Sequence, residues 1–303
     1  MKELTHHIEN NILRVAATTL GAELLSVQKL LSDGTPVDLL WIGDEKYWKG
    51  RAPILFPIVG RVKNGVYRYR GKTYSIDCPH GFLQSARFTR EETSNASRMA
   101  FTVESNETTL SQYPFPFRFR VEYSLHKNTL RVGFDIANTG AEPMPFSLGY
   151  HPGFPVPMEP SEKFEDCSLR FENDETPLQL LLDGVWMSGK SAPFPLVGHR
   201  TIPLQHNLFA NDAIILDSVQ KKIVSLCNSH HEPYLTLDYS DFRSLALWQP
   251  PEREPPFLCL ESWNGLPDET NVDVADILLK PGMILLAPGQ CYTAALSLQF
   301  HYP

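Results

Sequence analysis

The stretch Phe146–Pro157 reads FSLGYHPGFPVP and carries one histidine, His151, between an apolar run and the dipeptide Pro152-Gly153. Proline has no N–H to donate to a strand ladder, and glycine adopts backbone conformations that other residues avoid. The pattern therefore predicts a strand that ends near Tyr150. It places His151 at the rim of that strand, with its imidazole facing open space.

Two other segments carry side chains that could lie next to this histidine. His80 lies upstream in Cys78–Phe82, again at a break marked by proline and glycine, and Glu261 lies downstream in Leu260–Gly265. We expect His151, His80 and Glu261 to converge on one site.

Glu261 ends the apolar run Phe257–Leu260 and is followed by Ser-Trp-Asn-Gly. Burying an isolated carboxylate at the end of a strand costs free energy, so we expect this side chain either to have a hydrogen-bond or ion-pair partner or to be functional. Partial burial against Trp263 would raise its pKa and make it a stronger base. The alternative is a structural glutamate paired with an arginine.

The near-neutral pKa of histidine suits His151 to a general-acid role. The alternatives are a structural role for His151 and a turn-capping role for His80. A metal shared by the two imidazoles lacks the third ligand of a compact motif, so we predict no metal. Phosphate-binding glycine loops, the GxSxG nucleophile elbow and the HExxH zinc motif are also missing from the sequence.

Composition indicates a globular protein with an ample core. The 303 residues have a net charge of −8, which argues against a nucleic-acid or anionic-membrane partner and favours a neutral or weakly charged small-molecule ligand. We expect one domain over residues 1–303. Five scattered cysteines without CxxC spacing favour reduced thiols and a cytoplasmic location, and neither a signal-peptide core nor a membrane-spanning run is present. The cysteines are Cys78, Cys167, Cys227, Cys259 and Cys291.

Alternation of apolar and polar residues predicts many short strands. The clearest pair is Phe117–Leu125 with Leu130–Ile136, where each run keeps its apolar residues on one face. With 25 prolines and 18 glycines between such runs, an all-β sandwich or barrel is expected. We expect Thr176–His206 to be a long connection over the sheets and Thr270–Leu279 to be the helical segment.

Taken together, these segments resemble the aldose 1-epimerase (galactose mutarotase) family, and in particular its bacterial branch that includes the lactose-operon X protein. The motifs are collinear with the family and span the chain. They are Phe56–Arg61, Pro79–Phe82, Gly149–Phe154, Asn211–Ala213, Cys259–Trp263 and Leu286–Gly289.

The resemblance implies a single large antiparallel β-supersandwich with few short helices and a sugar cleft on one face. It implies that Glu261 is the general base, His151 the general acid and His80 the second active-site histidine. Arg61 and Asp212 match ligands of the sugar hydroxyls. Exposed aromatic side chains such as Trp263 and Trp48 would suit stacking on a sugar ring. The family interconverts α and β anomers of an aldose without a cofactor.

Alternatives to a free-sugar mutarotase remain open at this point. The chain has Gly-Tyr-His-Pro-Gly-Phe where well characterised galactose mutarotases have an Asn-rich Thr-Asn-His segment, so galactose is not the assured substrate. A hexose 6-phosphate is one alternative, and a non-catalytic carbohydrate-binding module is another. A retaining glycoside hydrolase would require a second carboxylate about 5 Å from Glu261, for which the sequence offers no convincing partner. We expect a monomer.

Overall fold

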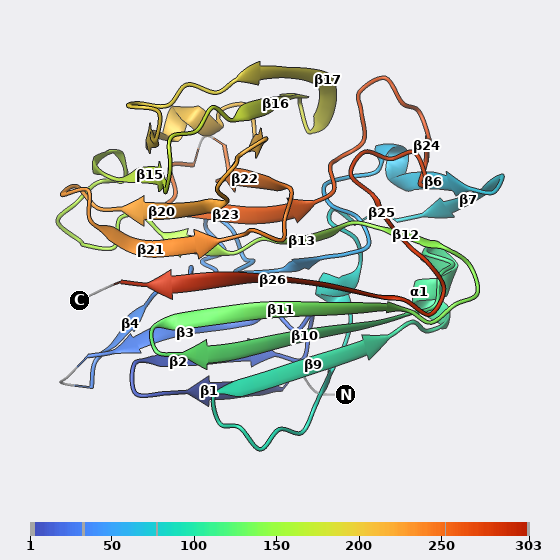
Figure 1. The fold of residues 1–303 in the computed structure, drawn as a ribbon, viewed down its shortest axis with the longest axis horizontal. Coiled ribbons are helices and arrows are strands. Elements are labelled where there is room, and N and C mark those ends of the chain that lie inside the picture. Colours follow the sequence, from blue (N-terminus) through green and yellow to red (C-terminus); the bar gives the residue numbers. More distant parts are fainter. Residues whose placement is uncertain (1–3, 32–33, 77, 252, 302–303) are drawn as a thin grey trace.

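The computed structural model describes residues 4–31, 34–76, 78–251 and 253–301. Its elements are almost all antiparallel strands, which confirms the predicted all-β fold. Across the described residues, hydrogen bonds between neighbouring strands group them into two large sheets and three small ones (Figure 1).

The first large sheet carries the long strands in the middle of Figure 1 and faces the second across the main core. In spatial order its strands are β18 (Thr201–Pro203), β15 (Ser168–Phe171), β20 (Ile223–Cys227), β21 (Pro233–Asp238), β26 (Cys291–Phe300), β11 (Thr129–Asn138), β10 (Phe117–His126), β9 (Arg98–Glu104) and β8 (Thr89–Arg90).

The second large sheet carries the candidate site. In spatial order its strands are β17 (Trp186–Pro193), β16 (Leu178–Asp183), β19 (Ile214–Asp217), β22 (Ser244–Trp248), β23 (Phe257–Asn264), β13 (Leu148–Tyr150) and β5 (Ile54–Leu55), with β14 (Gly153–Pro155) also paired to β23.

The remaining strands form three small sheets. They contain β1 (Thr5–Glu9), β2 (Leu13–Thr18), β3 (Leu24–Leu30) and β4 (Pro36–Asp38); β12 (Met144–Phe146) and β25 (Ile284–Leu286); and β24 (Ala275–Asp276), β6 (Val66–Tyr69) and β7 (Lys72–Ser75). The helical elements are α1 (Glu107–Gln112) and the 3₁₀ turns η1 (Lys63–Gly65), η2 (Leu83–Ser85), η3 (Phe164–Asp166) and η4 (His206–Phe209). No helix in the described ranges has the length and apolar character that a membrane span requires.

The central hairpin has the predicted register. In β10 and β11, Phe119 pairs with Ile136 and Val121 with Phe134, and these apolar side chains are buried while their polar neighbours face outward. Aromatic contacts then join the two large sheets. The ring of Phe134 lies 5.9 Å from that of Tyr150, and the ring of Phe119 lies 5.2 Å from that of Phe56. Such edge and tilted contacts stabilise the fold beyond the contribution of the apolar area that the rings bury.

Two expectations from the sequence are wrong. Residues 176–206 hold β16, β17 and β18 rather than a plain connection. Because β17 is an edge strand with one largely exposed face, its Ser-Gly-Lys-Ser segment shows little of the alternation that marks a half-buried strand.

The second wrong expectation concerns 270–279, which is not helical. Ala275 and Ile277 are buried and Asp276 and Leu278 are not, a spacing of two that matches the parallel bridge between β24 and β6. Within the described ranges the α-helix is α1, where Asn106 caps the first turn by accepting from the Thr109 N–H at 3.1 Å.

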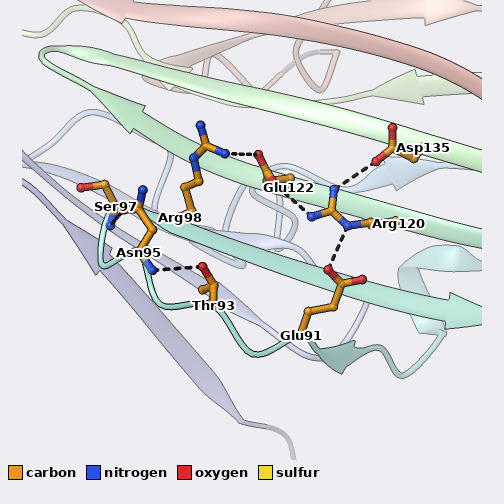
Figure 2. Close-up of polar contacts among 8 residues, drawn as sticks. All are labelled: Glu91, Thr93, Asn95, Ser97, Arg98, Arg120, Glu122 and Asp135. Carbon is orange, nitrogen blue, oxygen red and sulfur yellow. Dashed lines mark hydrogen bonds and ion pairs between the residues drawn. The ribbon is translucent and has the colours of Figure 1, made fainter.

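The outer face of β10 carries a charge cluster centred on Arg120 (Figure 2). Its guanidinium contacts Glu91 at 2.9 Å, Glu122 at 2.8 Å and Asp135 at 3.0 Å. Burial by itself would raise the pKa of Glu91, but hydrogen bonds from Thr102 and Arg120 outweigh it, so the pKa is lowered. The cluster therefore ties β9, β10 and β11 together while its carboxylates are ionised.

Replacing Arg120 by methionine should lower the free energy of unfolding by roughly 1–2 kcal/mol near pH 7, because Glu91, Glu122 and Asp135 would lose the cation that they share. A lowered pKa means that the carboxylate contributes stability above its unfolded pKa and loses it as the pH falls through the folded value. The deficit of Arg120→Met should therefore shrink below about pH 4. Urea unfolding at several pH values measures this, with exposed Arg87→Met as the control. A deficit that does not change with pH would contradict this account of the cluster.

Candidate active site

The site is organised by an interruption between two short strands. Strands β13 and β14 both pair with β23, with Tyr150 opposite Ser262 and Gly153 opposite Cys259. Between them the Leu260 N–H donates to the Pro152 carbonyl at 3.1 Å. His151 consequently lies opposite Glu261. The predicted end of the strand at Tyr150 is confirmed, whereas its resumption at Gly153 was not foreseen.

Strand β23 is buried on both faces, and its alternation decides where Glu261 points. Leu258 and Leu260 belong to the main core between the large sheets. Cys259 and Trp263 belong to smaller apolar clusters on the opposite face. Since side chains alternate along a strand, Glu261 lies on that second face, and the small Ala246 of β22 is its cross-strand neighbour.

A carboxylate–imidazole contact forms the centre of the site. Glu261 Oε1 lies 3.2 Å from His151 Nε2, and Glu261 Oε2 accepts from Trp263 Nε1 at 3.0 Å. Both side chains are buried. Burial raises the pKa of Glu261 well above its usual value, against the hydrogen bond from Trp263, and nearby Asp212 also raises it. Burial, followed by the proximity of His80, lowers the pKa of His151. Both groups therefore resist carrying a charge.

His80 lies next to the same contact in the cavity wall. Its ring centroid lies 5.5 Å from that of His151, nearly perpendicular to it. His80 Nδ1 accepts from the Gly60 N–H at 3.2 Å, so the neutral ring carries its proton on Nε2. Burial and the charge of Arg61 lower the pKa of His80 to about 4. At neutral pH His80 is thus a neutral hydrogen-bond donor.

Two glycines make this approach possible. Gly81 has φ +77°, and a Cβ there would lie 2.2 Å from the Phe56 carbonyl oxygen. Gly60 has φ +73°, and a Cβ there would lie 2.4 Å from the Pro267 ring. Both the left-handed backbone and the close contact exclude larger residues. The turns that present His80 and Arg61 therefore depend on these glycines.

These groups border one cavity of about 240 Å³. The six residues singled out from the sequence all contribute to its wall, namely Arg61, His80, His151, Asp212, Glu261 and Trp263. The structure thus brings them together, and their chemical roles stay predictions.

The expectation of an exposed Trp263 is wrong. Its side chain is only 4% exposed, because it packs beneath the cavity with Leu55 and Val59 and donates to Glu261. The flat aromatic surface at the cavity is supplied in part by Trp48, which is half-buried and stacks on the His151 ring at 4.8 Å and 25°.

Sequence reasoning missed Trp248 and Gln84. Trp248 borders the cavity and donates from Nε1 to Asp212 Oδ1 at 2.7 Å, which fixes one carboxylate oxygen of that aspartate. Gln84 also borders the cavity and donates to the Pro79 carbonyl at 2.8 Å, which holds the turn before His80. Trp248 ends β22, and the pairing of β22 with β19 brings it close to Asp212, which lies 36 residues earlier in the chain.

A buried ion pair holds the rim of the cavity near Arg61. Lys280 Nζ lies 2.6 Å from Asp268 Oδ1, and both side chains are 1% exposed. Asp268 Oδ2 accepts from the Lys63 N–H at 2.8 Å. The backbone of Asp268 donates to the Arg61 carbonyl and accepts from the Met187 N–H. One aspartate therefore joins the Arg61 segment to the β16–β17 hairpin. Removing one partner of such a pair is strongly destabilising.

No group of three or more His, Cys, Asp or Glu side chains within the described ranges has an arrangement that could hold a metal ion. The side chains at the cavity offer a carboxylate, two imidazoles and several hydrogen-bonding groups. Such a set suits proton transfer to and from the oxygens of a small polar molecule.

The antiparallel sheets and the cavity with its buried carboxylate–imidazole contact indicate a protein of the galactose mutarotase-like class, and comparison with solved structures agrees. A galactose mutarotase related enzyme from Lactobacillus acidophilus is 32% identical, with a TM-score of 0.91 over 99% of this chain and 98% of that one. A galactose mutarotase-like protein from Lactobacillus casei ATCC 334 is also 32% identical, with a TM-score of 0.90 over 98% of this chain and 100% of that one.

The chain belongs to the aldose 1-epimerase family, whose model matches residues 5–299. Among curated proteins, chromosomal protein LacX of Lactococcus lactis subsp. lactis is 34% identical over 283 residues, which cover 91% of this chain and 92% of LacX. The resemblance noted from the sequence is thereby confirmed. It supports a sugar epimerase or mutarotase role.

The lowered pKa of His80 predicts a specific loss of stability in acid. Because the folded pKa is about 4 and the unfolded value is 6.5, the unfolded chain binds the extra proton first. Stability should fall as the pH drops from 6.5 towards 4, with about 2 kcal/mol due to His80, given that the residue is partly exposed to solvent.

His80→Asn tests this, because asparagine tolerates the residue's φ of +66° and can accept from the Gly60 N–H. Wild type should lose more unfolding free energy than His80→Asn between pH 7.5 and 4.5 in urea titrations. Equal losses of unfolding free energy in the two proteins would show that the folded state does not hold His80 in its neutral form.

Proposed function

We propose that the protein is an aldose 1-epimerase that interconverts the α and β anomers of an aldose by acid–base ring opening. The observation that carries this proposal is the buried 3.2 Å contact between Glu261 and His151 in the cavity wall. A sugar placed there would offer its C1 hydroxyl and its ring oxygen, two oxygens on the same carbon, to two adjacent proton-transfer groups.

The contact can hold one proton on either partner. With the proton on His151, the carboxylate of Glu261 takes the proton of the C1 hydroxyl, and His151 gives its proton to the ring oxygen. The C1–O5 bond then breaks and the open-chain aldehyde forms. The pair now carries its proton on Glu261, so no proton is gained or lost overall.

Rotation about C1–C2 presents the other face of the aldehyde. Glu261 returns its proton to the carbonyl oxygen as the C5 hydroxyl attacks C1 and gives its proton to His151. The product is the other anomer, and the pair returns to its starting form. This cycle moves only protons and neither oxidises nor reduces the sugar. None of its steps therefore requires a metal or a cofactor.

Burial strengthens both halves of this exchange. A carboxylate with a raised pKa is a stronger base, and an imidazolium with a lowered pKa is a stronger acid. His80, neutral and protonated on Nε2, would donate a hydrogen bond to the negative charge that develops on the ring oxygen. Arg61 and Asp212 would bind hydroxyls, and Trp263 would orient the carboxylate of Glu261.

We further propose that the chain works as one domain, as a monomer, in the cytoplasm. The main apolar cluster includes residues from Ile8 to Phe300, which supports one folding unit. All five cysteines are free thiols, which suits a reducing compartment.

Glu261→Gln keeps the size of the side chain and an acceptor for the Trp263 N–H, but it removes the base. Wild type should accelerate the mutarotation of at least one α-aldose, followed by optical rotation, and Glu261→Gln should lose roughly 10²–10⁴-fold of that acceleration. The exposed Glu104→Gln on β9 is the matched control and should keep it.

Two results would replace the proposal. Sugar binding without acceleration of any aldose would favour a non-catalytic carbohydrate-binding module on the same fold. Release of reducing ends from a glycoside would indicate a hydrolase.

A further inference from the structure

The imidazole of His151 is oriented through only one of its two nitrogens by a polar group. Its Nε2 contacts Glu261, but its Nδ1 is buried and has no hydrogen-bond partner on another residue that the structure describes. Histidines that transfer protons are commonly held by a hydrogen bond at the second nitrogen, which fixes the plane of the ring. The plane of this imidazole therefore depends on its packing.

Three aromatic rings contact the imidazole of His151. The Trp48 indole stacks on it, with the ring centroids 4.8 Å apart and the planes inclined by 25°. The Trp248 indole and the His80 imidazole meet it edge-on, at 5.4 Å and 5.5 Å. Of these three rings only Trp48 lies nearly parallel to the imidazole. It blocks rotation about the Cβ–Cγ bond of His151, because a turning ring edge would enter the stacked indole.

The indole of Trp48 has a position that other groups set. It lies against two glycines, since a Cβ at Gly50 would be 2.5 Å from Trp48 Cζ2 and a Cβ at Gly153 would be 3.3 Å from Cζ3. The Phe257 ring stacks on the same indole at 5.9 Å and 24°. The Trp48 carbonyl accepts from Trp41 Nε1 at 2.8 Å, which holds the backbone. His151 thus stacks on a ring that the surrounding structure has already fixed.

The stack also has an electrostatic consequence. The face of an indole is electron-rich and attracts a cation placed above it. In the proposed cycle the pair begins with its proton on His151, and the Trp48 face stabilises that imidazolium. The contact therefore favours both the orientation and the protonation that the first step requires.

We propose that Trp48 is a positioning residue for the reaction, whose indole keeps His151 Nε2 directed at Glu261 and at the ring oxygen of the sugar. The stack takes the place of the hydrogen bond that Nδ1 lacks. This inference rests on the proposed mutarotase function. It differs from the role suggested by the sequence, in which Trp48 stacks on the sugar, because positioning affects kcat whereas sugar stacking affects KM.

Kinetics distinguish these two roles. Polarimetry on the whole protein follows the mutarotation of α-glucose, α-galactose and α-xylose, and the comparison uses the aldose that wild type accelerates most. Trp48→Leu and Trp48→Met should each lower kcat roughly 10- to 100-fold, because the general acid is no longer held in line. KM should change by less than about 3-fold. Trp48→Phe should retain most of kcat, since it keeps a flat ring.

Trp186→Leu is the matched control for these variants. It makes the same substitution at another half-buried indole, which does not border the catalytic cavity, and should leave kcat unchanged. Circular dichroism checks that each variant is folded. The two non-aromatic replacements of Trp48 ensure that a folding defect in one of them does not decide the outcome.

A second measurement is independent of activity. In NMR spectra of protein labelled with ¹³C at its histidines, the ring current of Trp48 should shift the ring protons of His151 upfield. His151→Asn identifies the signals by their loss. The upfield shift should be smaller but present in Trp48→Phe, and it should disappear in Trp48→Leu and Trp48→Met.

Three results overturn the inference. Unchanged kcat with a raised KM in the non-aromatic variants would show that the indole binds the sugar instead. A loss of kcat in Trp48→Phe as large as that in Trp48→Leu would show that a stacked ring is not sufficient. Identical His151 signals in wild type and Trp48→Leu would show that the indole does not hold the imidazole.

Absence of mutarotation by wild type with all three aldoses would refute the proposed function instead. In that case the NMR spectra would still decide whether Trp48 fixes the orientation of His151.

Discussion

The site depends on one interruption in the hydrogen-bond ladder of β23. His151 and Pro152 separate β13 from β14, and the ladder resumes on the same partner strand at Gly153. At this interruption the imidazole of His151 points towards Glu261, which lies within β23, a strand buried on both sides. The interruption leaves no backbone donor of this segment unpaired, because the His151 N–H donates to the Pro53 carbonyl and the Gly153 N–H to the Arg51 carbonyl.

Burial gives this contact its chemical character. The main core lies under one face of β23, and the β16–β17 hairpin borders the cavity on the other face. In such a setting burial disfavours the charged form of both groups, so the pKa of Glu261 is raised and the pKa of His151 is lowered. The same protein environment fixes the tautomer of His80 through the Gly60 N–H. Rigid neighbours such as Trp263 and Trp48 limit how far the two groups can move.

Much of the fold could be predicted because most strands have one apolar face. The alternation in Phe117–Leu125 and Leu130–Ile136 identified the central hairpin correctly. Elements without that alternation escaped prediction. Strand β17 is an exposed edge without clear alternation, and β24 contributes only two residues to its ladder, so its spacing of two is too short to identify a strand.

The candidate site could be predicted in part for a different reason. Proline and glycine mark backbone breaks, and at two such breaks the candidate site residues His80 and His151 lie outside the strands. Family resemblance then linked those breaks to Glu261. Trp248, Gln84 and Asp268 could not be found this way, because their importance arises from contacts that the sequence does not reveal. Asp268, for example, accepts a hydrogen bond from the Lys63 N–H, although the two residues are 205 positions apart in the sequence.

The most direct test of the account is a crystal structure of the Glu261→Gln variant with a bound reducing aldose. The account predicts that the C1 hydroxyl lies within hydrogen-bonding distance of residue 261, that the ring oxygen faces His151, and that the opposite end of the sugar points towards Arg61. A sugar bound with C1 turned to solvent, or bound outside this cavity, would contradict the assignment of the Glu261–His151 contact as the catalytic centre.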